Sequence, residues 1–322
     1  MAVTVYKSND ASAPALTGAA GSLCTVLDAV LVNGYGAKAA AGWAIPFTGT
    51  NLRIYRAPSG AMRGFMRVDD AASRAAPFAN GCEARISGSE GATAISTRTG
   101  VYPPTTNGII LRKSISADST ARPWIVVADA RTMYMFVQSG DYGNGWASFM
   151  FGEYFSLKPT SDGFNSLIAG SITEQLIATP TPLALNENLP KLSTAIITTA
   201  GHFTPRSWNG EFGPITTNMG IGKHGHGTHS NIGLVGLIPY PNPLDSAIYI
   251  SQCWLHEPMT LGIIRGRLRG FWHLLHPASS LVNGDTWSGA GALAGKTFLA
   301  ISPVPDGLGS FVMETSDTWE TN

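Results

Sequence analysis

The sequence predicts a mainly β fold of the α+β class, in which antiparallel, sandwich- or barrel-like β-rich units carry one N-terminal helix. The 37 glycines and 20 prolines among 322 residues interrupt the chain at short intervals, which favours many short strands joined by turns. Between these interruptions lie short runs of β-branched and aromatic residues, which are typical of strands. Only one segment has a helical period.

The predicted helix lies in the segment "GSLCTVLDAVLVNG". Its apolar residues recur at spacings of three and four, as on one face of a helix: Leu23, Val26, Leu27, Val30 and Leu31. The Asn33-Gly34 pair is a suitable C-terminal stop. We therefore expect a helix at about Ser22–Val32, with one apolar face against a sheet.

Two hairpins stand out among the predicted strands. The segments "NLRIYRA" and "MRGFMRVDD" flank the turn residues Pro58, Ser59 and Gly60. The segment "PWIVVADARTMYMFV" has two apolar runs around Asp129-Ala130 and predicts a tight hairpin. Further along, "GIIRGRLRGFWHLL" alternates weakly and contains two glycines, which predicts a bulged or strongly bent strand.

A change of pattern predicts two domains. Residues 1–171 are expected to form an N-terminal α+β domain that contains the helix. Residues 172–192, with three prolines and no clear period, predict an extended connector. Residues 193–322 are expected to form a C-terminal β-rich domain.

The charge balance excludes some partners and favours others. The 21 basic residues cancel the 21 acidic ones, so the chain has no net electrostatic attraction for nucleic acid or an anionic membrane. Only 13% of residues are charged, against about 25% in an ordinary soluble protein. Because interface cores are depleted in charge, this composition favours large protein–protein interfaces.

Cysteine usage and the apolar segments bear on the compartment. Cys24, Cys82 and Cys253 are far apart and form no C-x-x-C pair, so we expect three buried thiols in a protein made in a reducing cytoplasm. The first residues show no basic segment followed by an apolar run, and we therefore expect no signal peptide. No apolar stretch approaches the roughly 20 residues that a membrane helix needs.

Two stretches resemble catalytic or nucleotide-binding motifs only in part. "HGTHSNIGLVG" is similar to the histidine motif of subtilisin-like proteases, with His226 as the base, but no Gly-Thr-Ser segment supplies the serine. Asp129 also lies in an antiparallel hairpin pattern rather than after a parallel strand. "SGAGALAGKTFLAI" has Ala290 where a phosphate-binding loop needs glycine, and "KTFLAISPV" predicts a strand rather than a helix. We expect neither activity, and no catalytic or cofactor-binding residue is assigned.

The histidines of "GKHGHGTH" leave two interpretations open. The first is a glycine-rich loop whose histidines have no chemical role. The second is a metal site: His224 and His226 are two residues apart and point the same way on an extended chain, so copies around an oligomer axis would together bind iron or zinc. A similar H-x-H pair builds the axial iron sites of trimeric phage tail spikes.

Hydrolytic chemistry would need a pair of carboxylates in a cleft. Asp69-Asp70 and the more distant Glu153 and Asp162 are the candidates, but the sequence does not fix their separation. Solvated turns are the expectation for these residues, and a core role is the expectation for Trp124, Trp254 and Trp272.

Several segments together resemble one family. They are "LDAVLVNGYGAKAAAGWAIPFTGTNLRIYRAPSG", "FMRVDD", "TARPWIVVADARTMYMFV", "FMFGEYFSLKPTSDGFNSLIAG", "GIIRGRLRGFWHLLH", "LAGKTFLAI" and "ETSDTW". As an ordered series they are similar to uncharacterised virion structural proteins of tailed bacteriophages, associated with the tail, baseplate or neck. The "GHGTHSN" segment is not part of this shared pattern.

The resemblance implies a structural component of a phage particle that acts by protein–protein assembly and is not an enzyme. It implies synthesis in the cytoplasm of the host bacterium, a final location in the virion, and contacts with copies of itself and other virion proteins. We expect a homo-oligomer with no nucleic-acid or membrane partner. A host-receptor-binding protein, a capsid decoration protein and a tail-associated polysaccharide hydrolase remain alternatives.

Overall fold

The computed structural model describes most of the chain. The described residues are 2–58, 64–71, 82–104, 108–139, 146–160, 162–171, 200–211, 220–222, 239–257, 263–276, 281–301, 311–316 and 318–320. Two antiparallel sheets account for the strands in these residues, one with 12 strands and one with seven. The predicted mainly β fold is therefore confirmed.

The larger sheet runs in the order β1-β8-β9-β10-β12-β7-β5-β4-β3-β2, with β13 beside β12 and β6 beside β5. Its strands are β1 (Thr4–Lys7), β2 (Ala44–Gly49), β3 (Leu52–Arg56), β4 (Phe65–Asp69), β5 (Cys82–Ala92), β6 (Arg98–Tyr102), β7 (Ile109–Ser114), β8 (Trp124–Ala128), β9 (Thr132–Gln138), β10 (Trp146–Glu153), β12 (Ser166–Ser171) and β13 (Ala200–Phe203). Both expected hairpins are present, since β3 pairs with β4 and β8 pairs with β9.

The smaller sheet runs in the order β14-β15-β16-β19-β18-β17, with β11 beside β16. Its strands are β11 (Phe155–Ser156), β14 (Gly220–Gly222), β15 (Ile250–Glu257), β16 (Ile263–Leu274), β17 (Thr286–Ser288), β18 (Thr297–Ile301) and β19 (Phe311–Glu314), and the 3-10 turn η3 covers Gly291–Leu293. Pairing of β15 with β16 is interrupted by two register shifts, and Gly270 has a φ of 66°, as expected for the glycine-containing bent strand.

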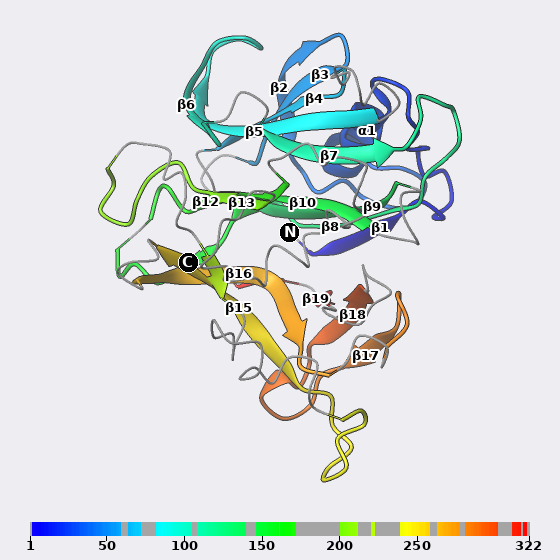
Figure 1. Ribbon diagram of the computed structural model, residues 1–322, viewed down its shortest axis with the longest axis vertical. Helices are drawn as coiled ribbons and strands as arrows, with labels where there is room; N and C mark the ends of the chain where they lie inside the picture. The colour runs from blue at the N-terminus through cyan, green and yellow to red at the C-terminus, as the bar shows by residue number, and fades with distance from the viewer. Residues whose placement is uncertain are drawn as a thin grey trace.

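The strands stack in three layers (Figure 1). The larger sheet folds over at the β12–β7 junction, where a single residue pair, Ser171 and Ile110, joins its two halves. One half contains β2 to β7 and the other contains β1, β8, β9, β10, β12 and β13. The smaller sheet covers the outer face of this second half, which thus becomes the central layer.

The central layer is buried on both faces because its side chains alternate between two cores. On β9, Met133, Met135 and Val137 belong to the core shared with the helix, whereas Tyr134 and Phe136 belong to the core shared with the smaller sheet. This double burial explains why "WIVVA" and "TMYMFV" are almost continuously apolar.

The predicted helix is confirmed, with a change of pitch. Helix α1 spans Ser22–Leu27, and the chain continues as the wider π-helical turn η1 over Asp28–Asn33. Gly34, with a φ of 75°, ends it and donates its N–H to the carbonyl of Ala29 at 2.7 Å. The buried face, which includes Leu23, Val26 and Leu27, packs into the core between the two halves of the larger sheet.

On each side of the expected domain boundary, one strand pairs with the sheet formed mainly by the other half of the chain. β11, which precedes the expected connector, pairs with β16 of the smaller sheet. β13, which follows it, pairs with β12 of the larger sheet. The connector itself, residues 172–192, lies outside the described residues, and the division into two domains stays a prediction.

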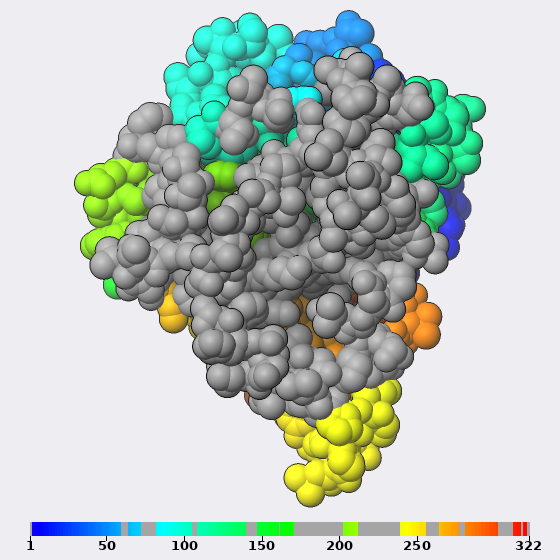
Figure 2. Space-filling view, in the orientation of Figure 1, coloured from blue at the N-terminus to red at the C-terminus, as the bar shows by residue number. Residues whose placement is uncertain are grey.

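A short arm, residues 239–249, projects beyond the smaller sheet (Figures 1 and 2). Asp245 holds it in shape by accepting hydrogen bonds from Asn242 Nδ2 at 2.6 Å and from the Ala247 amide at 3.0 Å. Ser246 adds a turn, because its amide donates to the carbonyl of Asn242 at 2.7 Å. The arm therefore has a defined conformation although most of it is exposed to solvent.

Candidate interaction site

The residues proposed for metal binding, His224 and His226, lie outside the described residues, as does His229. Within the ranges that the structure describes, no group of three histidine, cysteine, aspartate or glutamate side chains could hold a metal ion. The iron or zinc site therefore stays a prediction. No helix in the described part of the chain is long and apolar enough to cross a membrane.

The protease-like stretch "HGTHSNIGLVG" lies outside the described residues, whereas the stretch that resembles a phosphate-binding loop is part of the smaller sheet. Lys296 pairs with Glu314 at 2.7 Å, and Thr297 begins strand β18 rather than a helix, as predicted. Asp129 lies in the turn between β8 and β9, where its carboxylate accepts the amides of Arg131 and Thr132, both at 2.8 Å.

Three of the four candidate carboxylates have buried side chains, and for these three the expectation of solvated turns was wrong. The fourth, Asp69, is half-exposed and pairs with Arg67 at 3.0 Å. Asp70 is buried against Lys113, and it accepts the amides of Leu23 and Cys24 at 2.7 and 3.3 Å. Glu153 is buried and pairs with Arg131 at 3.0 Å, and burial raises its pKa. Asp162 lies 3.6 Å from Arg265. Each of the three buried carboxylates thus has its own basic partner, a pattern that the sequence could not show because these partners are distant along the chain.

The tryptophan and cysteine expectations are met in part. Trp124 is fully enclosed, while Trp254 and Trp272 are half-buried. The three cysteines are thiols rather than disulfides; Cys24 and Cys253 are buried, and Cys82 is half-buried.

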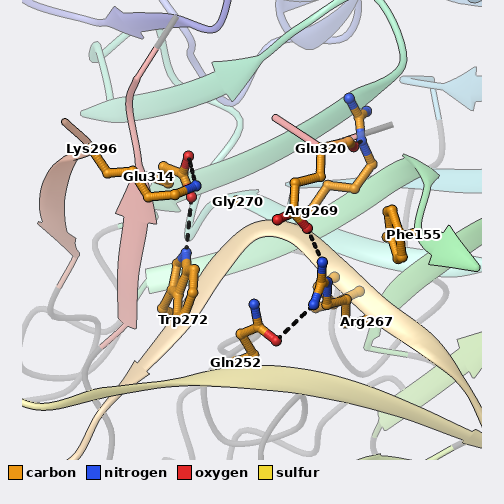
Figure 3. A pocket seen from close by; sticks show the side chains of 10 residues that line it. Phe155, Gln252, Arg267, Arg269, Gly270, Trp272, Lys296, Glu314 and Glu320 are labelled. Atoms are coloured by element: carbon orange, nitrogen blue, oxygen red, sulfur yellow. Dashed lines mark hydrogen bonds and ion pairs between the residues drawn. The ribbon is translucent and has the colours of Figure 1, made fainter. Parts of the chain in front are cut away.

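A charged pocket lies on the smaller sheet (Figure 3). Glu314 accepts hydrogen bonds from Lys296 and from the Trp272 indole at 3.3 Å, and Arg267 contacts Glu320 and Gln252. Its volume of about 20 Å³ is close to that of one enclosed water molecule. Because its charges are paired and its space is small, this pocket is a structural ion network.

A second concavity is large enough for a binding partner. It has a volume of about 460 Å³, within the range of roughly 300–1,000 Å³ usual for binding sites. We call it the groove. Its lining residues come from β11 and the loop after it, from the turn after β13, and from the start of β16: Ser156, Leu157, Lys158, Pro159, Thr160, Asp162, Trp208, Asn209, Ile264 and Arg265.

The walls of the groove are fixed by partly buried polar contacts. Asp162 accepts a hydrogen bond from Ser156 Oγ at 2.8 Å and another from the Phe164 amide at 3.2 Å. On the opposite wall, Arg206 pairs with Glu90 at 2.6 Å and lies 4.1 Å from the centre of the Phe164 ring. These contacts hold the loops of both walls in place.

Large apolar side chains remain exposed in this groove. The exposed fractions are 51% for Trp208, 46% for Leu157 and 48% for Ile264. Leu157 is held beside β16, because its amide donates to the carbonyl of Arg265 at 2.8 Å. Asp162 is the sole carboxylate in the described lining, and each of its two oxygens accepts a hydrogen bond from the protein.

The groove was not predicted from the sequence. Its residues come from three segments, and the first and last of these residues, Ser156 and Arg265, are more than a hundred positions apart. No local pattern joins the three segments. The one available signal was Trp208, which lies in the polar stretch "PRSWNGE" and not within an apolar strand. No family model matches the chain, and no curated protein is significantly similar to it.

Proposed function

We propose that this protein is a structural component of a tailed-bacteriophage particle, in the tail, baseplate or neck, and that it acts by protein–protein assembly. The observation that carries the proposal is the groove, in which three large apolar side chains share a rigid, concave surface exposed to solvent. Contiguous apolar surface of this kind marks interaction sites on folded proteins.

Two further features support assembly rather than catalysis. The chain is weakly charged and has no net charge, a composition that favours association. The groove lining that the structure describes lacks the pair of carboxylates that glycoside hydrolysis uses. The ordered series of segments that resemble virion proteins of tailed bacteriophages is the reason for proposing a phage particle as the site of assembly.

The proposal is tested on purified phage particles that encode this chain. Mass spectrometry of gradient-purified particles should detect the protein in a fixed ratio to the major tail protein, and gold-labelled antibody should mark one position in the tail, baseplate or neck. Absence from the particles contradicts the proposal. Labelling over the capsid surface would instead support a decoration protein, and release of reducing sugar from host polysaccharide would support a hydrolase.

A further inference from the structure

We infer that the arm of one copy docks into the groove of a second copy, with Leu244 placed against Trp208. This inference rests on the proposed role in assembly and names the partner as the same chain. It joins two surfaces that one molecule presents separately: a projecting arm with an apolar tip and a concave site with an exposed indole.

The arm has the form of an inserting element. Leu244 is 90% exposed, which makes it the most exposed of the large apolar side chains that the structure describes. Pro241 and Pro243 lie on either side of Asn242, next to this leucine, and both are exposed. Proline-rich segments bind aromatic-lined grooves because their backbone is already restricted before binding.

The base of the arm is clamped by one histidine. His276 is buried, its Nε2 accepts the amide of Tyr249 at 2.8 Å, and its Nδ1 lies 3.0 Å from the carbonyl of Pro239. Since Nε2 accepts, Nδ1 carries the proton and donates to Pro239. The two ends of the arm are thus tied to one side chain, and docking does not incur the cost of ordering a loop.

The charges of the two surfaces are complementary. Asp245 is the only charged residue of the arm, residues 239–249. The groove contributes Lys158, which is exposed, and the Arg265–Asp162 pair, so its lining has an excess of one positive charge. An acidic arm is therefore attracted to this groove rather than repelled by it.

The geometry requires two molecules. Strand β16 starts at the groove, near Arg265, and ends at Leu274, close to the arm base; nine residues of straight strand would span roughly 30 Å, which is an upper limit for this bent strand. Figure 1 shows the arm projecting beyond the C-terminal end of β16, whereas the residues of β16 that line the groove, Ile264 and Arg265, lie at its start. An arm-to-groove contact is therefore between unlike surfaces, and repetition of such a contact generates a ring or an open chain.

Sedimentation velocity of the full-length protein tests this contact. Leu244→Asp and Trp208→Ala should each weaken self-association by about tenfold or more, the effect of losing an interface anchor. Val282→Asp is the matched control, because Val282 is an aliphatic residue with 71% exposure that belongs to neither surface, and it should leave association unchanged.

A mixing experiment tests whether the arm of one copy binds the groove of another. The Leu244→Asp protein keeps an intact groove and the Trp208→Ala protein keeps an intact arm, so an equimolar mixture should form 1:1 dimers that cannot grow further. Larger wild-type assemblies, loss of assembly in both variants and dimers in the mixture would support the inference. A monomeric wild-type protein at its highest soluble concentration, or assemblies that both variants leave intact, would overturn it.

The outcomes also separate this inference from the proposed function. If the protein is present in phage particles but Leu244→Asp does not alter its association, only the arm-to-groove contact is wrong. If it self-associates through the arm but is absent from particles, the virion role is wrong and the contact stands. Saturable quenching of tryptophan fluorescence by host polysaccharide that is lost in Trp208→Ala, with a monomeric wild type, would assign the groove to a saccharide and overturn the inference.

Discussion

Arg269 of β16 binds Asp129 of the β8–β9 turn through two hydrogen bonds, of 2.6 and 3.2 Å, and so joins the smaller sheet to the central layer. Both side chains are almost completely buried. Arg269 also donates to Thr132 Oγ1 at 2.7 Å and to the carbonyl of Glu320 at 2.8 Å.

Removal of this arginine should loosen the contact between the two layers. We expect Arg269→Ala to lower the free energy of unfolding by about 3–5 kcal/mol, because it leaves the Asp129 carboxylate buried without its cationic partner. The control is Arg67→Ala, which removes a half-exposed pair with Asp69 and should cost about 0.2–1 kcal/mol. Urea denaturation measures both, and equal losses in the two variants would contradict this assignment.

The buried pair of Asp70 and Lys113 should show strong coupling. Asp70→Ala removes the acceptor for two helix amides and leaves Lys113 as a buried charge, so a loss of about 3–5 kcal/mol is expected. Lys113→Met instead leaves the Asp70 carboxylate as a buried charge without its basic partner. Because Asp70→Ala/Lys113→Met contains neither charge, its loss should be smaller than the sum of the two single losses. A double-mutant cycle tests this, and additive losses would show that the pair is not coupled.

Burial of Cys24 should make the protein sensitive to alkali. Burial raises the pKa of the Cys24 thiol to about 12, so above pH 9 the unfolded chain releases a proton that the folded protein keeps. This contribution to stability is complete below pH 9 and is lost as the pH rises towards 12, by about 1.4 kcal/mol per pH unit. Cys24→Ala should have a shallower decline between pH 9 and pH 11 in urea-denaturation series. Parallel declines for the two proteins would rule out this role for the thiol.

Gly270 should be intolerant of a side chain for two reasons. Its φ of 66° disfavours other residues, and an added Cβ would lie 2.1 Å from the Trp319 indole nitrogen. Gly291 has a similar φ of 57° but open space around it, so Gly291→Ala measures the backbone effect alone. Gly270→Ala should lower the thermal unfolding midpoint clearly more than Gly291→Ala does. Similar midpoints would mean that the indole moves aside without cost.

The hydrophobic period was sufficient to predict the local elements. The spacing of Leu23, Val26 and Leu27 predicted the helix, and the apolar runs around Asp129 predicted the β8–β9 hairpin. Such patterns depend on neighbours within a few positions, and these neighbours are visible in the sequence.

The contacts between distant segments were not predictable in this way. Asp70 reaches the amides of Leu23 and Cys24 across more than 40 positions, and Arg269 reaches Asp129 across 140. A charged residue that is paired in the core has the same local sequence as one in a solvated turn, which is why Asp70, Glu153 and Asp162 were placed wrongly. The groove could not be predicted for the same reason. The exposed indole of Trp208 acquires its neighbours only when β11, the turn after β13 and β16 come together in the fold.

The pairing of β1 with β8 has a consequence for the biosynthesis of the protein. Thr4 lies opposite Ala128, so the first strand leaves the ribosome long before its partner exists. At about 5–20 residues per second, roughly 6 to 25 s separate the synthesis of these two residues. Throughout that interval β1 of the nascent chain has no partner strand. Neighbouring ribosomes on one messenger RNA hold identical unpaired strands close together, and such strands can pair with one another. We therefore expect the yield of soluble protein to depend on the rate of translation as well as on the stability of the finished fold.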